Sequence, residues 1–156
     1  MSQKYRVLTL WQPYATFIAM GLKKFETRSW NPITQLPPKP RLQPGEIIMI
    51  HAAKRKLETY EKSLLGSKAL ANALMATGRV MPVLPYGAIV CACRFIDAHP
   101  TDEFQAQGIE RKLGNYQPGR YAWELELLRV PPEPIPATGK QGIWVWQMPE
   151  REVSDE

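Results

Sequence analysis

Short segments rich in hydrophobic residues, several of them alternating with polar residues, predict β-strands along most of this chain. Alternation puts successive side chains on opposite faces of a strand, so that one face can be buried while the other contacts solvent. The segments that show this pattern are residues 5–10, 24–30, 46–52, 86–98, 119–130 and 143–146. In the most regular of them, Trp123 and Leu125 would lie on the buried face and Glu124 on the other.

Other segments repeat hydrophobic residues at the spacing of a helix. Residues 15–20 form a short apolar run between a proline and Gly21, which suit the first turn and the end of a helix. Residues 57–76 place apolar side chains on one helical face, with Gly66 as a weak point. Thr101 suits the N-cap of a further short helix.

The order of these elements predicts an α+β fold. Five or six strands and two or more helices follow one another irregularly, which favours a curved or barrel-like mixed sheet over a parallel doubly wound sheet. We expect a single domain at residues 1–149 and a polar C-terminal tail at residues 150–156. Residues 32–44 contain five prolines and predict an extended loop, and loops of that length are often functional.

The composition limits the classes of protein to consider. No apolar run approaches the roughly 20 residues of a membrane span, and no apolar signal segment follows Met1, so we expect a cytoplasmic protein without a membrane partner. Basic residues exceed acidic residues by 20 to 15, which is compatible with a nucleic-acid partner. Cys91 and Cys93 share one strand face and are expected to be reduced core thiols. The cysteines and histidines lack the spacing of a zinc site, and no metal or organic cofactor is predicted.

The residues with candidate chemistry are concentrated near the N-terminus. Glu26 and Arg28 would share one face of a strand, with Lys23 at the turn before it. The carboxylate would hold both cations in place. Nearby aromatic rings could form the walls of a pocket in which a planar base stacks, and a glutamine amide could read the edge of the base. The expected binding residues are Trp11, Gln12, Tyr14, Lys23, Glu26, Arg28, Trp30, His51 and Lys54.

The spacing of Gly21, Lys23, Glu26 and Arg28 resembles the G-x-K-x-x-E-x-R signature of the ASCH family. Segments 10–14, 50–54, 119–125 and 142–144 also resemble that family, so that the similarity covers most of the chain. The resemblance implies a PUA-like β-barrel fold and binding of RNA, a nucleoside or a nucleotide. The main departure is the proline-rich segment 32–44, where many relatives carry a short link with an Arg-Gly pair; contacts from that link do not transfer.

Three functions remain open, and we favour an RNA- or nucleotide-binding domain with a base-accepting cleft. The first alternative is a hydrolase. Some small bacterial ASCH proteins are amidohydrolases that remove the acetyl group from N4-acetylcytidine. The resemblance implies that they use a lysine, a threonine and a later glutamate. In that case Lys23 and Glu26 would be catalytic, with Glu26 in the position of the threonine and Glu124 as a weak candidate for the later glutamate. The second alternative is an adaptor that binds a protein through the loop at residues 32–44.

Some of these residues could instead have purely structural roles. Lys23, Glu26 and Arg28 could form an ordinary surface ion-pair cluster, and His51 could be a hydrogen-bonded histidine at a strand end rather than part of a cleft rim. The three tryptophans of the later strands share faces with aliphatic residues and are expected in the core; they are Trp123, Trp144 and Trp146.

Overall fold

The computed structural model describes residues 3–149, and the predicted tail at 150–156 lies outside these residues. Within the described part, seven strands and four helices are formed. The strands are β1 (Lys4–Leu10), β2 (Phe25–Arg28), β3 (Ile47–Ala52), β4 (Ala88–Pro100), β5 (Tyr121–Arg129), β6 (Ile135–Pro136) and β7 (Ile143–Gln147). The helices are α1 (Tyr14–Ala19), α2 (Thr59–Leu65), α3 (Lys68–Thr77) and α4 (Ile109–Lys112).

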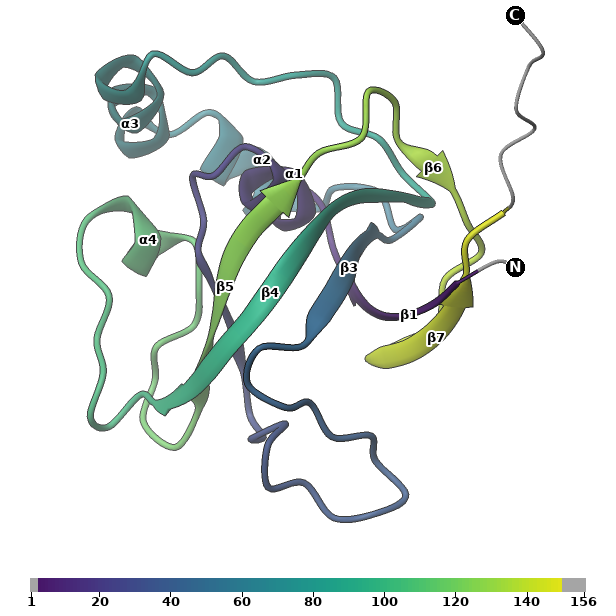
Figure 1. The fold of residues 1–156 in the computed structure, drawn as a ribbon. Coiled ribbons are helices and arrows are strands. Elements are labelled where there is room, and N and C mark those ends of the chain that lie inside the picture. The colour runs from purple at the N-terminus through teal and green to yellow at the C-terminus, as the bar shows by residue number, and fades with distance from the viewer. Residues whose placement is uncertain (1–2, 150–156) are drawn as a thin grey trace, which may run out of the picture.

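The strands form one curved mixed sheet in the order β2-β5-β4-β3-β1-β7, with β6 paired to β4. Only the β1–β3 pair is parallel among the described strands. The pairing of β4 shifts register near Ala92 and again near Phe95, and such bulges bend a strand. Figure 1 shows that β7 and β1 curve away from β4 and β5. The two-residue strand β6 lies beside the start of β4, with which it pairs. The predicted α+β fold with a curved sheet is confirmed; β6 is a short strand that the alternating pattern did not predict.

Two of the four buried hydrophobic clusters among the described residues pack on opposite sides of the curved sheet. The larger lies between α1 and the strands, and its most buried side chains include Leu8, Phe95 and Trp123. The smaller contains Trp144 and Trp146. Burying one large apolar side chain is worth roughly 1.5–3 kcal/mol, so these clusters supply much of the driving force for folding. The predicted core positions of the three tryptophans are therefore confirmed.

Two helix predictions need correction. The segment 57–76 forms two helices instead of one, because α2 ends at Gly66 and the side chain of Ser67 then accepts a hydrogen bond from the Leu70 N–H to start α3. The prediction that Thr101 begins a helix was wrong. Its hydroxyl donates to the Gln117 carbonyl at 2.8 Å and accepts from the Arg120 N–H at 3.1 Å, which ties the end of β4 to the start of β5.

The proline-rich loop contains no helix or strand, as expected. It is nonetheless anchored, because Leu42 is buried in the larger core and its N–H donates to the Pro32 carbonyl at 2.9 Å. The side chain of Arg6 also bonds to the Arg41 carbonyl. This anchoring places Lys39 against the Trp30 ring, 5.5 Å from its centre. Binding of a protein partner through this loop stays a prediction.

Candidate functional site

The pairing of β2 with β5 determines which side chains share a face. Glu26 lies opposite Trp123, and Arg28 lies opposite Tyr121. Residues directly opposite each other on paired strands project to the same side, so Glu26 and Arg28 both lie on the side of the larger core. Glu124 is opposite Phe25 and projects to the other side, where its carboxylate is 2.8 Å from His99 Nε2. Glu124 is therefore separated from Glu26 by the sheet.

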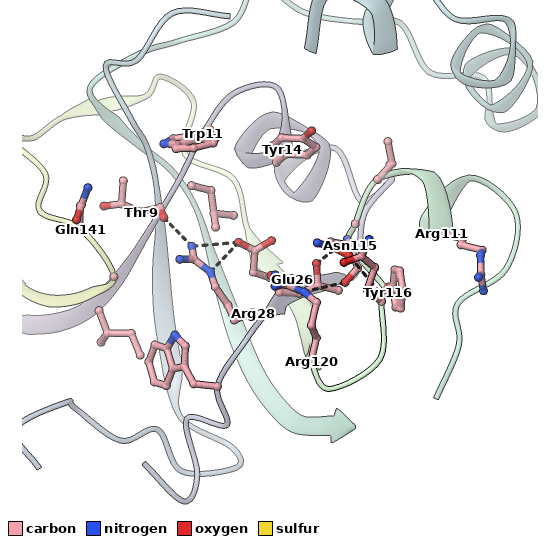
Figure 2. A pocket seen from close by; sticks show the side chains of 18 of the residues that line it. Thr9, Trp11, Tyr14, Glu26, Arg28, Arg111, Asn115, Tyr116, Arg120 and Gln141 are labelled. Carbon is pink, nitrogen blue, oxygen red and sulfur yellow. Dashed lines mark hydrogen bonds and ion pairs between the residues drawn. The ribbon is translucent and has the colours of Figure 1, made fainter. Parts of the chain in front are cut away.

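Glu26 and Arg28 form an ion pair at the centre of the site. Arg28 Nε and Nη2 both lie 3.1 Å from Glu26 Oε2. The same guanidinium donates from Nη2 to the Thr9 carbonyl at 3.1 Å, so the side chain bridges β2 to β1 (Figure 2). The Arg28 side chain keeps 27% of its surface exposed, whereas that of Glu26 keeps 13%. The pair is thus fixed by the fold and still open to a ligand.

Lys23 lies behind this pair and is fully buried. It follows the end of α1, where Gly21 adopts a φ of +75° that favours glycine over other residues. Lys23 Nζ donates to the Leu113 carbonyl at 2.7 Å and lies 4.0 Å from Glu26 Oε1. Burial lowers the pKa of Lys23, and the nearby carboxylates of Glu26 and Glu110 partly oppose that effect. The lysine therefore contacts the ion pair from inside the protein.

A cleft of about 1270 Å³ lies in front of the ion pair. Trp11, Tyr14 and Trp30 all line it, and the Trp11 ring is 53% exposed. Burial raises the pKa of Tyr14 to about 12, so its phenol is a neutral hydrogen-bond donor at ordinary pH. In Figure 2, Trp11 and Tyr14 lie on the same side of the Glu26–Arg28 pair. The arrangement combines flat apolar rings with a fixed donor–acceptor pair.

Trp11 is held in place from outside the cleft. The Arg55 guanidinium lies 3.8 Å from the centre of the Trp11 ring, although Arg55 does not itself line the cleft. Arg55 is fixed in turn by ion pairs of 2.6 Å to Glu61 and 2.9 Å to Glu58. Such cation–π contacts are worth about 0.5–2 kcal/mol. One face of the indole is thus covered, and its other face is available to a ligand.

The opposite wall of the cleft comes from a segment that sequence reasoning missed. Residues 111–118 and Arg120 line it, between α4 and β5. The segment is bound to β2, because the Asn115 N–H donates to Thr27 Oγ1 at 2.8 Å and Arg120 Nη2 donates to the Thr27 carbonyl at 3.2 Å. Neither periodicity nor spacing marks these residues; adjacent basic residues at 111 and 112 are the only local signal.

Comparison with known proteins identifies the family. The model of the ASCH domain matches residues 8–132, which run from the end of β1 through β5 and include both Glu26 and Arg28. This chain belongs to the ASCH domain family. Among solved structures, the ASCH protein of Zymomonas mobilis is similar, with 16% sequence identity, a TM-score of 0.39, and coverage of 84% of this chain and 72% of that one. Comparison with curated proteins gives no match.

Four of the nine predicted binding residues of this ASCH domain lie away from the cleft lining: Lys23, which is buried behind the ion pair, and Gln12, His51 and Lys54. Gln12 is fully buried, and its amide donates to the Pro85 carbonyl at 2.7 Å while its oxygen accepts from the Thr16 N–H at 3.0 Å. Gln12 thereby fixes the start of α1. Lys54 is exposed, and its aliphatic chain packs over Gly87 outside the cleft. Both side chains support the fold near the site instead of facing a ligand in it.

His51 is the fourth such residue. Its ring is buried, with Nε2 at 2.8 Å from the Ala137 carbonyl and Nδ1 at 3.3 Å from Thr9 Oγ1. It also packs edge-on against Trp144, and a Cβ added at Gly139 would come within 2.2 Å of the ring. Burial lowers the pKa of His51. The structure therefore shows His51 as a hydrogen-bonded histidine at a strand end and not as part of the cleft rim.

Residues 3–149 of the ASCH domain contain neither a candidate membrane span nor a metal-binding cluster. None of their helices combines the length and the apolar character that a membrane crossing requires. Within the same range, His, Cys, Asp and Glu side chains form no group of three or more that could hold a metal ion. Cys91 and Cys93 are buried free thiols whose sulfur atoms lie 3.9 Å apart, as expected of reduced core residues.

Proposed function

We propose that this ASCH domain binds RNA or a nucleotide by accepting one unstacked base into the cleft. The observation that carries the proposal is the Glu26–Arg28 ion pair, which faces a cleft lined by the open ring of Trp11. Domains of the ASCH family are thought to bind RNA, which agrees with the chemistry of the cleft. Sequence-specific RNA recognition commonly takes single bases out of the stack and packs them on aromatic rings.

Each part of the site has a role in this proposal. The free face of Trp11 stacks on the base, and such stacking is worth about 1–3 kcal/mol per base. Arg28 supplies donors and Glu26 supplies an acceptor to the edge of the base, where charge-assisted hydrogen bonds are stronger than neutral ones. Lys23 fixes Glu26 from behind, so the carboxylate is oriented before the ligand arrives. Hydrogen bonds already formed to Thr9 and Glu26 reduce the ordering cost for Arg28.

We expect Arg28→Ala to weaken binding of single-stranded RNA about tenfold or more, because a hydrogen bond to a charged group is worth roughly 1.5–3 kcal/mol. Fluorescence anisotropy at low salt with short oligonucleotides of mixed sequence measures this affinity. Arg129→Ala is the matched control, since Arg129 is an exposed arginine at the end of β5 that does not line the cleft. Failure of the wild-type domain to bind RNA or nucleosides at low salt would exclude the proposal.

One observation favours a second candidate, an amidohydrolase acting on N4-acetylcytidine or a similar N-acylated nucleoside. Lys23 is buried with a lowered pKa and lies 4.0 Å from Glu26, which is a common setting for acid–base chemistry. In this scheme Glu26 takes a proton from water, the water oxygen attacks the acetyl carbon, and Lys23 or Arg28 stabilises the oxyanion. The bond between the acetyl carbon and N4 then breaks, N4 receives the proton that Glu26 took from water, and cytidine and acetate leave.

Incubation with N4-acetylcytidine, followed by chromatography, separates the two candidates. The hydrolase predicts cytidine formation by the wild-type domain, loss of turnover in Glu26→Gln with binding of the nucleoside retained, and loss of turnover in Lys23→Ala. Glu124→Gln is the control, because Glu124 lies across the sheet from Glu26 and contacts His99. An inactive wild-type domain whose tryptophan fluorescence still responds to the nucleoside would leave base binding as the function.

A further inference from the structure

Most of the cations that line the cleft come from parts of the chain far from the ion pair. Among the described residues, five cationic side chains line it against a single carboxylate, that of Glu26. The five are Arg28, Lys39, Arg111, Lys112 and Arg120. Apart from Arg28, the basic residues of segments 23–28 and 54–56 do not line the cleft. The excess of positive charge at the site therefore depends on the wall formed by residues 111–120.

Some side-chain hydrogen-bond donors of this wall have no acceptor among the described residues. Lys112 is exposed, and its ammonium group makes no hydrogen bond or ion pair with another described residue. Arg111 uses Nη1 to bond Gln105 at 2.6 Å, which leaves the rest of its guanidinium unused in this structure. Arg120 donates from Nε to the Asn115 carbonyl at 3.1 Å and from Nη2 to the Thr27 carbonyl. Its remaining nitrogen, Nη1, is not used in these bonds.

The wall is held in a fixed position beside the base site. The Leu113 carbonyl accepts from Lys23, and the Asn115 N–H donates to Thr27, so its backbone is bonded to the same segment that carries Glu26. In Figure 2, Arg111, Asn115 and Arg120 lie on one side of Glu26, and Arg28 and Thr9 lie on the other. The cleft thus has a region of rings and base-reading groups next to a separate cationic region.

The size of the cleft indicates a ligand larger than a free nucleoside. Its volume of about 1270 Å³ exceeds the roughly 300–1,000 Å³ of most small-molecule pockets. A base stacked on Trp11 near Arg28 would leave the cationic region empty. Spare guanidinium and ammonium donors without a facing carboxylate suit phosphate oxygens, which accept several charge-assisted hydrogen bonds.

We infer that Arg111, Lys112 and Arg120 form a phosphate-binding subsite, so that the cleft selects phosphorylated nucleotides over nucleosides. This inference rests on the proposed binding of a base beside Glu26 and Arg28, and it specifies the ligand: a nucleotide with a phosphate attached to its ribose, either as a free monophosphate or within a single strand. The phosphate contacts position the ligand, and the Glu26–Arg28 pair reads the base.

The test compares the four common nucleosides with their 5′- and 3′-monophosphates, using calorimetry at low salt. We expect at least one monophosphate to bind the wild-type domain about tenfold or more tightly than its nucleoside. The double variant Arg111→Gln, Lys112→Gln should reduce this ratio to near one. A matched double variant, Lys62→Gln, Lys68→Gln, removes two exposed lysines of α2 and α3 that do not line the cleft, and it should keep the wild-type ratio.

The outcomes separate this inference from the proposed function. Equal binding of nucleosides and monophosphates by the wild-type domain would overturn the phosphate subsite and leave base binding intact. A phosphate gain that survives the Arg111→Gln, Lys112→Gln substitutions would also overturn it. Absence of binding of either form would overturn both proposals. With a single-stranded oligonucleotide, loss of two phosphate contacts should further reduce the salt slope of log K by about 1.4 in magnitude.

Discussion

Glu26→Gln is expected to lower the free energy of unfolding by about 3 kcal/mol at pH 7. Lys23 is fully buried, and among the described residues Glu26 supplies the only carboxylate oxygen within 4.0 Å of its ammonium nitrogen. Removing one partner of a buried pair leaves the other charge uncompensated in a poorly solvated site. Urea unfolding, followed by tryptophan fluorescence, measures the loss.

The pH dependence of this loss identifies Lys23 as its cause. Because burial holds the pKa of Lys23 below its ordinary value of 10.5, the unfolded chain binds more protons than the folded one between those two pKa values. The contribution of this group to stability therefore rises with pH in that window. Loss of the Glu26 charge lowers the pKa of Lys23 further, so the penalty of Glu26→Gln should shrink as pH approaches 10.5.

Two further variants control this experiment. Glu124→Gln removes a carboxylate from the opposite face of the same strand pair, where it is 38% exposed, and we expect a loss below about 1 kcal/mol. Lys23→Met combined with Glu26→Gln should cost less than the sum of the single substitutions, because no uncompensated charge remains. If Glu26→Gln were as mild as Glu124→Gln at pH 7, the buried pair would not stabilise the site as described.

Trp11→Ala is expected to weaken binding of nucleosides and RNA by about 1–3 kcal/mol, or roughly 5- to 150-fold. Trp11 is half exposed, and Arg55 contacts its ring from outside the cleft, so the domain itself should lose little stability. Calorimetric titration measures the affinity, and thermal unfolding shows that the variant is folded. Tyr86→Ala, which removes an exposed aromatic ring outside the cleft, should bind as the wild-type does. Unchanged affinity in Trp11→Ala would contradict stacking at this ring.

The part of the site that follows from local spacing could be predicted from the sequence. Residues two apart on a strand share a face, and this rule alone places Glu26 beside Arg28. The short helix before β2 likewise follows from its apolar run and Gly21. These predictions concern neighbours in the chain, where geometry depends on few other residues.

The remaining features depend on contacts between distant segments. Gln12 and His51 are polar residues next to the motif, but their partners are the carbonyls of Pro85 and Ala137, which are 73 and 86 positions away. The wall at residues 111–118 joins the cleft through hydrogen bonds of Leu113 to Lys23 and of Asn115 to Thr27, which are 90 and 88 positions away. No local pattern in a single sequence specifies such pairings. Sequence reasoning therefore predicted the centre of the site and missed its cationic wall.

The central claim, that a base enters the cleft and stacks on Trp11, is tested most directly by NMR. The protein has five tryptophans, and each indole N–H gives its own signal in a ¹H–¹⁵N spectrum. Trp11 and Trp30 line the cleft, whereas Trp146 is buried in the smaller core. During titration with a mixture of nucleoside monophosphates, the Trp11 signal should shift in a saturable way while the Trp146 signal stays in place. Saturable shifts of other signals without a shift of the Trp11 signal would contradict the account, because the ligand would then bind outside this cleft.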